Sequence, residues 1–453
     1  MTSPIAAIIL AAGKGTRMKS DTHKVLHPLA GRPMLLHLVD SVAALDPART
    51  IVVVGAGRAQ VEAAVHPLGV ETVEQVEQLG TAHAVLEARS ALAGFEGDVL
   101  VLFGDVPRVG SATLARMLER LHADDEPATV ALGFRPADPA AYGRVIADAD
   151  GRIDRIVEFK DASPEERAVT LCNSGLFAAR AADLFDLLAK VGNDNAAGEY
   201  YLPDIVSVAA SAGRHSAVIE VPAAEVAGVN SRAELAAVEA EWQQARRAQA
   251  MTDGATLIAP KTVWFAHDTR LGRDVLIEPN VFFGPGVEVA DRVTIHAFSH
   301  IEGAQIASGA VVGPYARLRP GTVLGEDAKV GNFVETKKAV LGKGAKANHL
   351  TYLGDAEVGA GANIGAGTIT CNYDGFFKYR TSIGEGAFIG SNSALVAPVS
   401  IGKDATVAAG SVVTQDVEAG ALGLARARQE SKPGWGTRFR EMMKARKAGG
   451  SSK

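Results

Sequence analysis

Cysteine, aromatic residues and long apolar runs are all scarce in this sequence of 453 residues. Its two cysteines, Cys172 and Cys371, supply neither a disulfide framework nor a cysteine metal motif, so we expect a protein of the reducing cytoplasm. No apolar run reaches the roughly 18–20 residues that span a membrane, and the N-terminal segment lacks the basic start of a signal peptide. We therefore expect no membrane insertion.

The composition also bounds the architecture. Aromatic residues make up only 6% of the chain while apolar residues make up 47%, which suits an interior built from Ile, Val and Ala. A chain of 453 residues exceeds one compact core, so we expect two or more domains. The last part of the sequence, residues 424–453, is strongly basic and ends in Gly and Ser, and we expect its end to be partly disordered.

An aliphatic residue or Phe recurs at every sixth position through much of the second half, with occasional steps of five. A period of six matches neither the roughly 3.6 residues of a helix turn nor the alternation of a strand. The recurring residues are Leu271, Ile277, Phe283, Val289, Ile295, Ile301, Ile306, Val312, Leu318, Leu324, Val330, Leu341, Ala347, Leu353, Val358, Ile364, Ile383, Ile389, Leu395, Ile401, Val407 and Val413.

This period predicts a solenoid of very short parallel strands joined by tight turns. The recurring side chains would point inward and stack about 4.8 Å apart in successive coils. Glycine often follows the recurring residue, as at Gly313 and Gly390, and it permits the positive φ or the close backbone contact that a tight corner needs. A purely structural rod or an oligomerisation device is the alternative interpretation.

The first half begins with a buried strand at residues 5–10, followed by the glycine-rich loop AAGKGTRM. Gly13 and Gly15 would let backbone N–H groups approach a phosphate, and Lys14, Arg17 and Lys24 add positive charge. The loop is neither a Walker A motif nor a dinucleotide fingerprint.

Strands and helices then alternate, which predicts an α/β doubly wound, mainly parallel sheet. Asp105 follows the buried strand at residues 99–103, at the sheet edge where such folds bind ligands. A carboxylate facing a basic loop suggests a divalent metal that bridges to phosphates. The alternative is an Asp that caps the next turn.

We expect three parts, namely a domain at residues 1–229, a helical linker at 230–250 and the solenoid with its basic tail at 251–453. Ser231 and Glu234 form a capping box at the start of the linker helix. Leu235, Val238 and Trp242 then share one face at helical spacing, which we interpret as packing.

The solenoid carries polar clusters that a rod does not need. They comprise Arg317, Arg319, Lys337, Lys338, His349, Tyr352, Asn363, Asn372, Tyr373 and Asp374. The rhythm of six breaks at residues 371–380, which predicts a protruding loop of the kind that carries function. His349 is the best candidate general base, because an unperturbed pKa of about 6.5 suits removal of a proton from an amine.

At this point a family resemblance is evident. The segments LAAGKGTRM with Lys24 and Pro28, QVEQLGTAHA (75–84), FGDVP (103–107), YGRV (142–145), IVEFKDA (156–162), CNSGLF (172–177) and VNSR (229–232) are similar to the sugar-1-phosphate nucleotidyltransferase family. With the hexapeptide array behind them, nearly the whole chain resembles the bacterial bifunctional N-acetylglucosamine-1-phosphate uridyltransferase and glucosamine-1-phosphate N-acetyltransferase family.

The resemblance implies that a left-handed parallel β-helix follows the first domain. It also implies two reactions, in which glucosamine 1-phosphate is acetylated by acetyl-CoA and the product is then joined to UMP from UTP. The product would be UDP-N-acetylglucosamine for peptidoglycan and lipopolysaccharide. The implied metal is Mg²⁺, for which Mn²⁺ or Co²⁺ could substitute. The implied assembly is a homotrimer with acetyltransferase sites at subunit boundaries, in the cytoplasm and without nucleic acid.

The family's functional residues in the first domain carry over by motif. Arg17 and Lys24 would be catalytic cations that face the phosphates, and Asp105 and Asn230 would hold the metal. The implied nucleotide- and sugar-binding residues are Leu10, Ala11, Ala12, Gly13, Lys24, Gln75, Gly80, Thr81, Phe103, Gly104, Asp105, Gly143, Glu158, Asn173 and Asn230. Phe103 stands where family members often carry Tyr, so one polar contact is in doubt.

In the solenoid the resemblance implies that His349 activates the amine of glucosamine 1-phosphate. Arg319 and Lys337 would hold the sugar phosphate, with Tyr352 and Asn363 on the sugar. The residues implied to contact acetyl-CoA are Ala366, Asn372, Tyr373, Ser391, Ala409 and Arg426. Asn372 is also a candidate donor to the thioester oxyanion.

Two other functions are compatible with parts of the sequence. One is a nucleotidyltransferase whose solenoid only regulates or oligomerises, as in related ADP-glucose and GDP-mannose enzymes; His349 with the NYDG loop argues against it. The other is a sugar-nucleotide sensor without catalysis; Asp105 and Asn230 argue against that, because a binder has less need of a metal.

Overall fold

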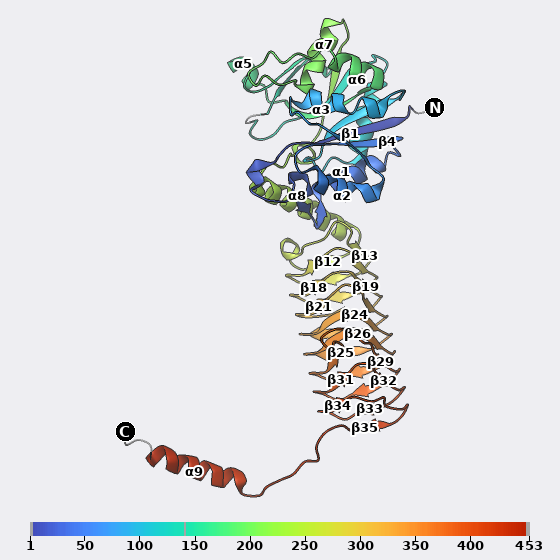
Figure 1. Ribbon diagram of the computed structural model, residues 1–453, viewed down its shortest axis with the longest axis vertical. Helices are drawn as coiled ribbons and strands as arrows, with labels where there is room; N and C mark the ends of the chain where they lie inside the picture. The colour runs from blue at the N-terminus through green and yellow to red at the C-terminus, as the bar shows by residue number, and fades with distance from the viewer. Residues whose placement is uncertain (1–2, 140–141, 450–453) are drawn as a thin grey trace. The chain divides into compact units, whose positions relative to one another are not determined.

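The structure is a computed structural model that describes residues 3–139 and 142–449 and divides into two compact units (Figure 1). The first unit contains Met1–Gln249 with Phe265–His267, and the second contains Ala250–Trp264 with Asp268–Lys453. Helix α8 (Arg232–Thr252), expected as a linker, therefore lies mostly in the first unit. The reason is its apolar face, since Val238 is buried with Leu29 and Met34.

A nine-stranded sheet forms the centre of the first unit. Its order is β5 (Glu71–Glu74), β4 (Arg49–Val54), β1 (Ile5–Ala11), β6 (Asp98–Phe103), β10 (Cys172–Arg180), β7 (Thr129–Phe134), β11 (Ser216–Glu220), β9 (Arg152–Val157) and β8 (Arg144–Ala147). The strands from β5 to β6 are parallel, as expected. The other half is mixed, because β10 runs antiparallel to both of its neighbours, β6 and β7.

Helices cover both faces of this sheet, which confirms the doubly wound fold (Figure 1). Alternate residues of β1 enter two separate cores: Ile8 lies in one and Ile9 in the other, and neither is exposed. One core is covered by α3 (Thr81–Glu87), α6 (Ala181–Leu188) and α7 (Ile205–Ser211), and the other by α1 (Met34–Ala43), α2 (Arg58–Val65) and α4 (Ser111–Leu121). The short α5 (Pro164–Arg167) follows β9.

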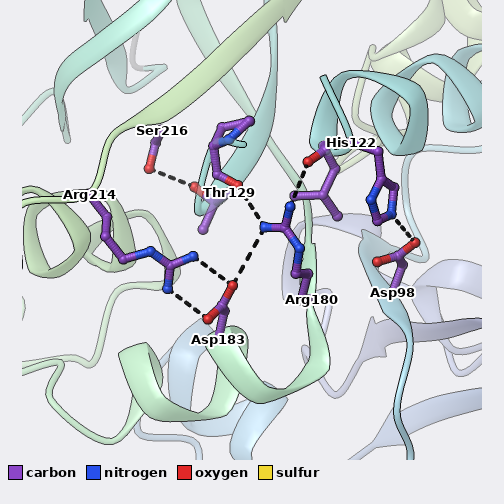
Figure 2. Close-up of polar contacts among 9 residues, drawn as sticks. Asp98, His122, Thr129, Arg180, Asp183, Arg214 and Ser216 are labelled. Carbon is purple, nitrogen blue, oxygen red and sulfur yellow. Dashed lines mark hydrogen bonds and ion pairs between the residues drawn. The ribbon is translucent and has the colours of Figure 1, made fainter. Parts of the chain in front are cut away.

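A cluster of polar side chains lies where β6 begins and β10 ends (Figure 2). Asp98 at the start of β6 lies 2.7 Å from His122 Nε2, and Arg214 makes two hydrogen bonds, of 2.6 and 2.7 Å, to Asp183 at the start of α6. Arg180 at the end of β10 donates to the backbone carbonyls of Leu121, the last residue of α4, and Pro127, which precedes β7. These contacts link β6 and β10 to the helices and loops beside them.

The second unit is a parallel β-helix, as the period of six predicts (Figure 1). We call its three sides the first, second and third face, in the order in which the chain visits them. The first face is one sheet: β12 (Thr256–Leu257), β14 (Leu276–Ile277), β17 (Thr294–Ile295), β20 (Val311–Val312), β23 (Lys329–Asn332), β25 (Lys346–His349), β27 (Asn363–Ile364), β30 (Phe388–Ile389), β33 (Thr406–Val407) and β35 (Leu422–Gly423).

Two long strands, β24 (Glu335–Leu341) and β26 (Tyr352–Val358), turn from the second face to the third. The second face also contains β15 (Phe282–Phe283), β18 (His300–Ile301), β21 (Arg317–Leu318), β28 (Ile369–Cys371), β31 (Ala394–Val396) and β34 (Val412–Val413). The third contains β13 (Arg270–Leu271), β16 (Glu288–Val289), β19 (Ala304–Ile306), β22 (Thr322–Leu324), β29 (Thr381–Ile383) and β32 (Val399–Ile401).

The strand register explains each irregularity of the sequence period. Ile277 pairs with Ile295, so one coil takes 18 residues; Ile295 pairs with Val312, so a step of five shortens the next coil to 17. Ile364 pairs with Ile389, which makes a coil of 25 residues that accommodates the expected loop. Two inward slots missed by the period hold buried threonines, Thr336 and Thr370.

Beyond the solenoid, part of the basic tail forms helix α9 (Trp435–Gly449). The partial disorder that we expected concerns only the end of the tail, after about residue 447. The last residues, 450–453, lie outside the described residues. Among the residues that the structure describes, no helix is long and apolar enough to cross a membrane.

The stacked interior predicts a local loss of stability when a coil is hollowed out. Ile389 is fully buried between Ile364 and Val407, whereas its neighbour Phe388 is 49% exposed. We expect Ile389→Ala to cost about 2–5 kcal/mol and Phe388→Ala much less. Native-state hydrogen exchange over residues 360–410 measures this cost. Equal loss of amide protection in both variants would contradict the inward stack.

Candidate active sites

A cavity of about 320 Å³ lies at the carboxyl ends of β1 and β6. Most residues that the family resemblance assigned to the nucleotide line it: Leu10, Ala11, Ala12, Gly13, Lys24, Gln75, Gly80, Thr81, Phe103 and Asp105. Sequence reasoning missed Val25, Gln78, Ala84 and Glu199, which line it too. The structure thus brings segments more than 90 residues apart to one edge of the parallel sheet, where doubly wound folds bind ligands.

Two glycines shape this cavity. Gly15 has φ +59°, and a Cβ there would lie 2.5 Å from Lys24 Cβ. Gly80 has φ +119°, and a Cβ there would lie 2.5 Å from the Tyr200 carbonyl oxygen. Both loops therefore depend on glycine for their course.

Two glutamines hold the loops in place. The side chain of Gln78 donates to the Ala12 carbonyl at 2.7 Å and so ties the glycine-rich loop to the segment before α3. The buried Gln75 donates to the Gly80 carbonyl at 3.1 Å. Gly104, also expected to bind the nucleotide, is not among the residues lining the cavity, and its amide donates to the Leu10 carbonyl at 3.0 Å.

Both expected metal ligands, Asp105 and Asn230, contact the side chain of Lys24. The Lys24 ammonium group donates to the Asp105 carboxylate and, at 3.2 Å, to Asn230 Oδ1. The ammonium group shows that the oxygens of Asp105 and Asn230 can bind one positive charge together. These two residues therefore fit a divalent cation. Proteins usually bind Mg²⁺ through one or two carboxylates, and substrate phosphates and water supply its other ligands. One carboxylate and one amide oxygen are therefore enough protein ligands for Mg²⁺. Among the described residues no cluster of three or more His, Cys, Asp or Glu residues could hold a metal.

Arg17 lies apart from these groups. It is exposed in a single 3₁₀ turn (Thr16–Met18) after the glycine-rich loop and is not among the residues lining the cavity. Its expected contact with phosphates stays a prediction.

A second cavity of about 260 Å³ shares Thr81 and Phe103 with the first. The expected sugar-binding residues Gly143, Glu158 and Asn173 line it. Other residues in its wall are Tyr142, Ser174, Gly175, Leu202 and Pro203. A nucleotide in the first cavity and a sugar in the second would therefore meet at Phe103.

The carboxyl group of Glu158 is electrostatically unusual. Burial raises its pKa above the ordinary value, and the negative charges of Asp204 and Asp161 raise it further. The pKa of Asp204 is also raised, again chiefly by burial. A buried acceptor of this kind gains most from a ligand that donates hydrogen bonds, such as a sugar hydroxyl group.

In the second unit, His349 ends strand β25 and lies 2.6 Å, through Nδ1, from Asn332 Oδ1. The amide oxygen can only accept, so Nδ1 carries the proton and Nε2 is left to take one from a substrate. Asn332 and His349 are paired in successive coils. Asn332 lies 17 positions before His349, which is one coil of the solenoid. The sequence could have identified Asn332 as a partner of His349 only through this spacing.

Three residues expected to contact acetyl-CoA lie beside His349 in successive coils. The Gly367 amide bonds the His349 carbonyl at 3.4 Å, and the Asn392 and Gly410 amides bond the carbonyls of Ala366 and Ser391 at 2.7 and 2.8 Å. Ala366, Ser391 and Ala409 thus form one column of small side chains at the corner between the first and second faces. Arg426 lies near the end of this column, since a Cβ at Gly410 would be 4.0 Å from its Cδ.

A cluster of cations lies at the opposite edge of the second face. The pKa of Lys337 is lowered, first by its contact with Lys378 and also by the charge of Arg319. Arg319 itself donates to Glu335 at 2.8 Å. Lys378, which sequence reasoning missed because it lies in the loop that breaks the period, therefore belongs to this group. Three cations held this close suit a phosphate.

Tyr352 and Asn372 lie at the same edge as the cations. A Cβ at Gly354 would lie 2.3 Å from the Tyr352 hydroxyl oxygen and 2.8 Å from Asn372 Nδ2, so both side chains converge over this glycine. Asn372 Nδ2 also donates to Asp355 at 2.5 Å.

The remaining expected residues are further apart. Tyr373 is exposed in the loop, and its hydroxyl group donates to the Gly375 carbonyl at 2.5 Å. Asn363 lies on the first face, paired with Lys346 and Phe388. One chain therefore divides the expected acetyltransferase residues between two corners and two faces.

Comparison with known proteins gives matches over both units. The protein-family model described as "MobA-like NTP transferase domain" matches residues 7–156. "Bacterial transferase hexapeptide (six repeats)" matches residues 268–303, and "Hexapeptide repeat of succinyl-transferase" matches 380–415.

Relatives match over the whole length. The bifunctional protein GlmU of Sphingopyxis alaskensis is 66% identical over 99% of both chains, and that of Novosphingobium aromaticivorans is 68% identical over 99% of both. The bifunctional protein GlmU of Zymomonas mobilis is 60% identical over 97% of this chain and 98% of its own.

The raised pKa of Glu158 predicts a pH-dependent gain in stability on its replacement. An acid whose pKa is raised by folding destabilises the fold above its unfolded pKa, here 4.5, and has no such effect below it. We expect Glu158→Gln to raise the melting temperature by a few degrees at pH 7.5, and the gain to vanish as the pH falls toward 4.5. Calorimetry beside the exposed control Glu119→Gln measures this difference. A gain independent of pH would rule out the electrostatic cause.

Proposed function

Because this chain belongs to the family of the bifunctional protein GlmU, it is a uridyltransferase and an acetyltransferase of UDP-N-acetylglucosamine synthesis, and we propose which residues carry each reaction. The first unit joins N-acetylglucosamine 1-phosphate to UMP and releases pyrophosphate. The solenoid supplies that substrate by acetylating glucosamine 1-phosphate. The observation that carries the assignment is the presence of two separate sets of polar residues, one in each unit.

In uridyl transfer, a phosphate oxygen of the sugar 1-phosphate attacks the α-phosphorus of UTP, and the bond to pyrophosphate breaks. The nucleophile is already an anion, so no general base is needed, and the obstacle is the approach of two anions. Lys24 and Arg17 hold the phosphates in this account, with backbone N–H groups of the glycine-rich loop. Mg²⁺ held by Asp105 and Asn230 supplies charge neutralisation and alignment when bound.

The linings of the two cavities support an assignment for the rest of the substrate. The uracil lies against Gln75, Gly80 and Thr81, whose loop is fixed by the hydrogen bond from Gln75 to the Gly80 carbonyl. The sugar lies in the second cavity, where Glu158 and Asn173 bind its polar groups. Phe103 lines both cavities and lies between the nucleotide and the sugar. Because Phe103 has no hydroxyl group, it contacts them by packing and makes no side-chain hydrogen bond.

In acetyl transfer, Nε2 of His349 takes a proton from the amine of glucosamine 1-phosphate, and the nitrogen attacks the thioester carbon. A C–N bond forms, the C–S bond breaks, and CoA leaves as its thiol once it gains a proton. Arg319, Lys337 and Lys378 bind the sugar phosphate. The extended arm of CoA lies along the column of small side chains that begins beside His349.

The division of these residues between two corners supports a shared site. A chain that carries His349 at one corner and the phosphate cluster at another needs a second copy to complete the site. We therefore propose that the chain acts as a homotrimer in the cytoplasm, with each acetyltransferase site built from neighbouring copies. Asn363, on the first face, would then reach a neighbour's substrate.

Replacement of the metal-binding carboxylate separates the two activities. We expect Asp105→Asn to lower kcat for uridyl transfer by roughly a hundredfold or more, because one charged ligand is lost. Acetyl transfer from the same preparation should be unchanged. The exposed Asp124→Asn serves as a control. Parallel loss of both activities in Asp105→Asn would contradict the assignment.

Mixing of two inactive variants tests the shared site. We expect His349→Ala and Asn372→Ala each to abolish most acetyl transfer when assembled alone. Chains of the two kinds, unfolded and refolded together, should regain activity, because random mixing gives about one intact site in four. A mixture that stays inactive while it assembles normally would mean that one chain holds the whole site.

A further inference from the structure

The corner between the first and second faces contains an unusual run of bulky residues. In successive coils it is occupied by Asn280, Phe298, Tyr315, Phe333, Leu350, Gly367, Asn392 and Gly410, all with φ between 50° and 75°. Gly and Asn adopt this left-handed conformation readily, whereas bulky residues rarely do. The chain uses Gly or Asn at four of these positions, so the bulky residues at the other four meet a need other than that of the turn.

These four side chains form one exposed surface, which we call the aromatic corner (Phe298, Tyr315, Phe333 and Leu350). The rings stack, with centroids 5.0 Å apart for Phe298 and Tyr315 and 5.2 Å for Tyr315 and Phe333. Phe333 is 55% exposed and Leu350 is 61% exposed. Leu350 directly follows His349, so this apolar surface ends at the catalytic base.

A second apolar surface lies at the other edge of the second face, on the loop that breaks the period. Tyr373 bridges Lys378 in antiparallel fashion, and Asp374 Oδ1 accepts hydrogen bonds from the amides of Phe376 and Phe377 at 2.8 and 2.6 Å. The loop is thus a braced hairpin that presents both Phe side chains, 86% and 68% exposed, at its tip.

We propose that Phe376 and Phe377 of one copy pack on the aromatic corner of the next copy, which makes this contact the latch that closes each acetyltransferase site. The inference rests on the proposed function, because the shared site requires His349 of one copy to meet the phosphate cluster of another. Phe377 directly precedes Lys378 of that cluster, and Leu350 directly follows His349. Bringing the two halves of the site together therefore brings the two apolar surfaces together.

The latch predicts that Phe333→Asn weakens assembly without lowering the stability of the single chain. Phe333→Asn removes a large apolar side chain but puts a residue at φ 56° that tolerates the left-handed region, as Asn280 and Asn392 do in the same column. We expect the dissociation constant of the assembly, from sedimentation velocity, to rise at least tenfold while the unfolding temperature of the dissociated chain stays equal or rises. A residue with a merely structural role in the coil would lower that temperature.

The double variant Phe376→Ser/Phe377→Ser tests the other side of the latch. It should weaken assembly to a similar degree and lose acetyl transfer upon dilution, with recovery at high protein concentration and no change in uridyl transfer. The control is Phe388→Ser, which removes a Phe that is 49% exposed on the first face. Equal weakening by this control would locate the contact elsewhere and overturn the proposal.

The remaining outcomes separate the latch from the function on which it rests. If wild type is a monomer that acetylates glucosamine 1-phosphate, the shared site itself is wrong. If wild type assembles but neither Phe333→Asn nor the loop variant weakens it, the latch is wrong and the shared site stands. If instead truncation after Glu430 causes dissociation, the tail with helix α9 is the occupant of the aromatic corner, and this also overturns the proposal.

Discussion

The backbone hydrogen bonds between successive coils are the constraint on which the second unit depends. They fix each residue beside one that lies 17, 18 or 25 positions further along the chain, and the buried aliphatic stack keeps that register from slipping. A functional group placed at one position of a coil is therefore part of a column. His349, Ala366, Ser391 and Ala409 form such a column although 60 positions separate the first from the last.

The first unit solves a different physical problem. Its reaction brings together two anions, and its answer is a concentration of positive charge and backbone N–H groups at one edge of a parallel sheet. Lys24 contacts both Asp105 and Asn230, so this cation and the two proposed metal ligands lie within one small volume. We propose that the sugar binds beyond Phe103, beside the buried carboxyl group of Glu158, whose pKa burial raises. In this proposal the charged groups and the hydrogen-bonding groups act at separate parts of the site.

Much of the fold follows from the sequence because its signals are local. The period of six predicts the coils, and even its steps of five match coils of 17 residues. The inward Thr336 and Thr370 could not be predicted, since their hydroxyl groups are satisfied only by partners that the register provides. The antiparallel β10 was also beyond reach, because strand direction depends on connections that cross the whole unit.

The candidate sites show the same limit. Motifs predicted the residues that line the nucleotide cavity, but Gln78, Asn332 and Lys378 were missed. Each of these acts through a partner distant in the chain, and no spacing in the sequence marks it. The roles of Arg17 and Asn363 remain predictions, since one lies outside the cavity lining and the other on a separate face.

We conclude that one chain holds two catalysts that work in sequence. Product analysis on the wild-type protein tests it most directly, with glucosamine 1-phosphate, acetyl-CoA, UTP and Mg²⁺ in one mixture and N-acetylglucosamine 1-phosphate, UTP and Mg²⁺ in another. We predict UDP-N-acetylglucosamine from both mixtures, and from the first mixture only while acetyl-CoA is present. Product from the second mixture alone would contradict it and would make the solenoid a scaffold for a single nucleotidyltransferase.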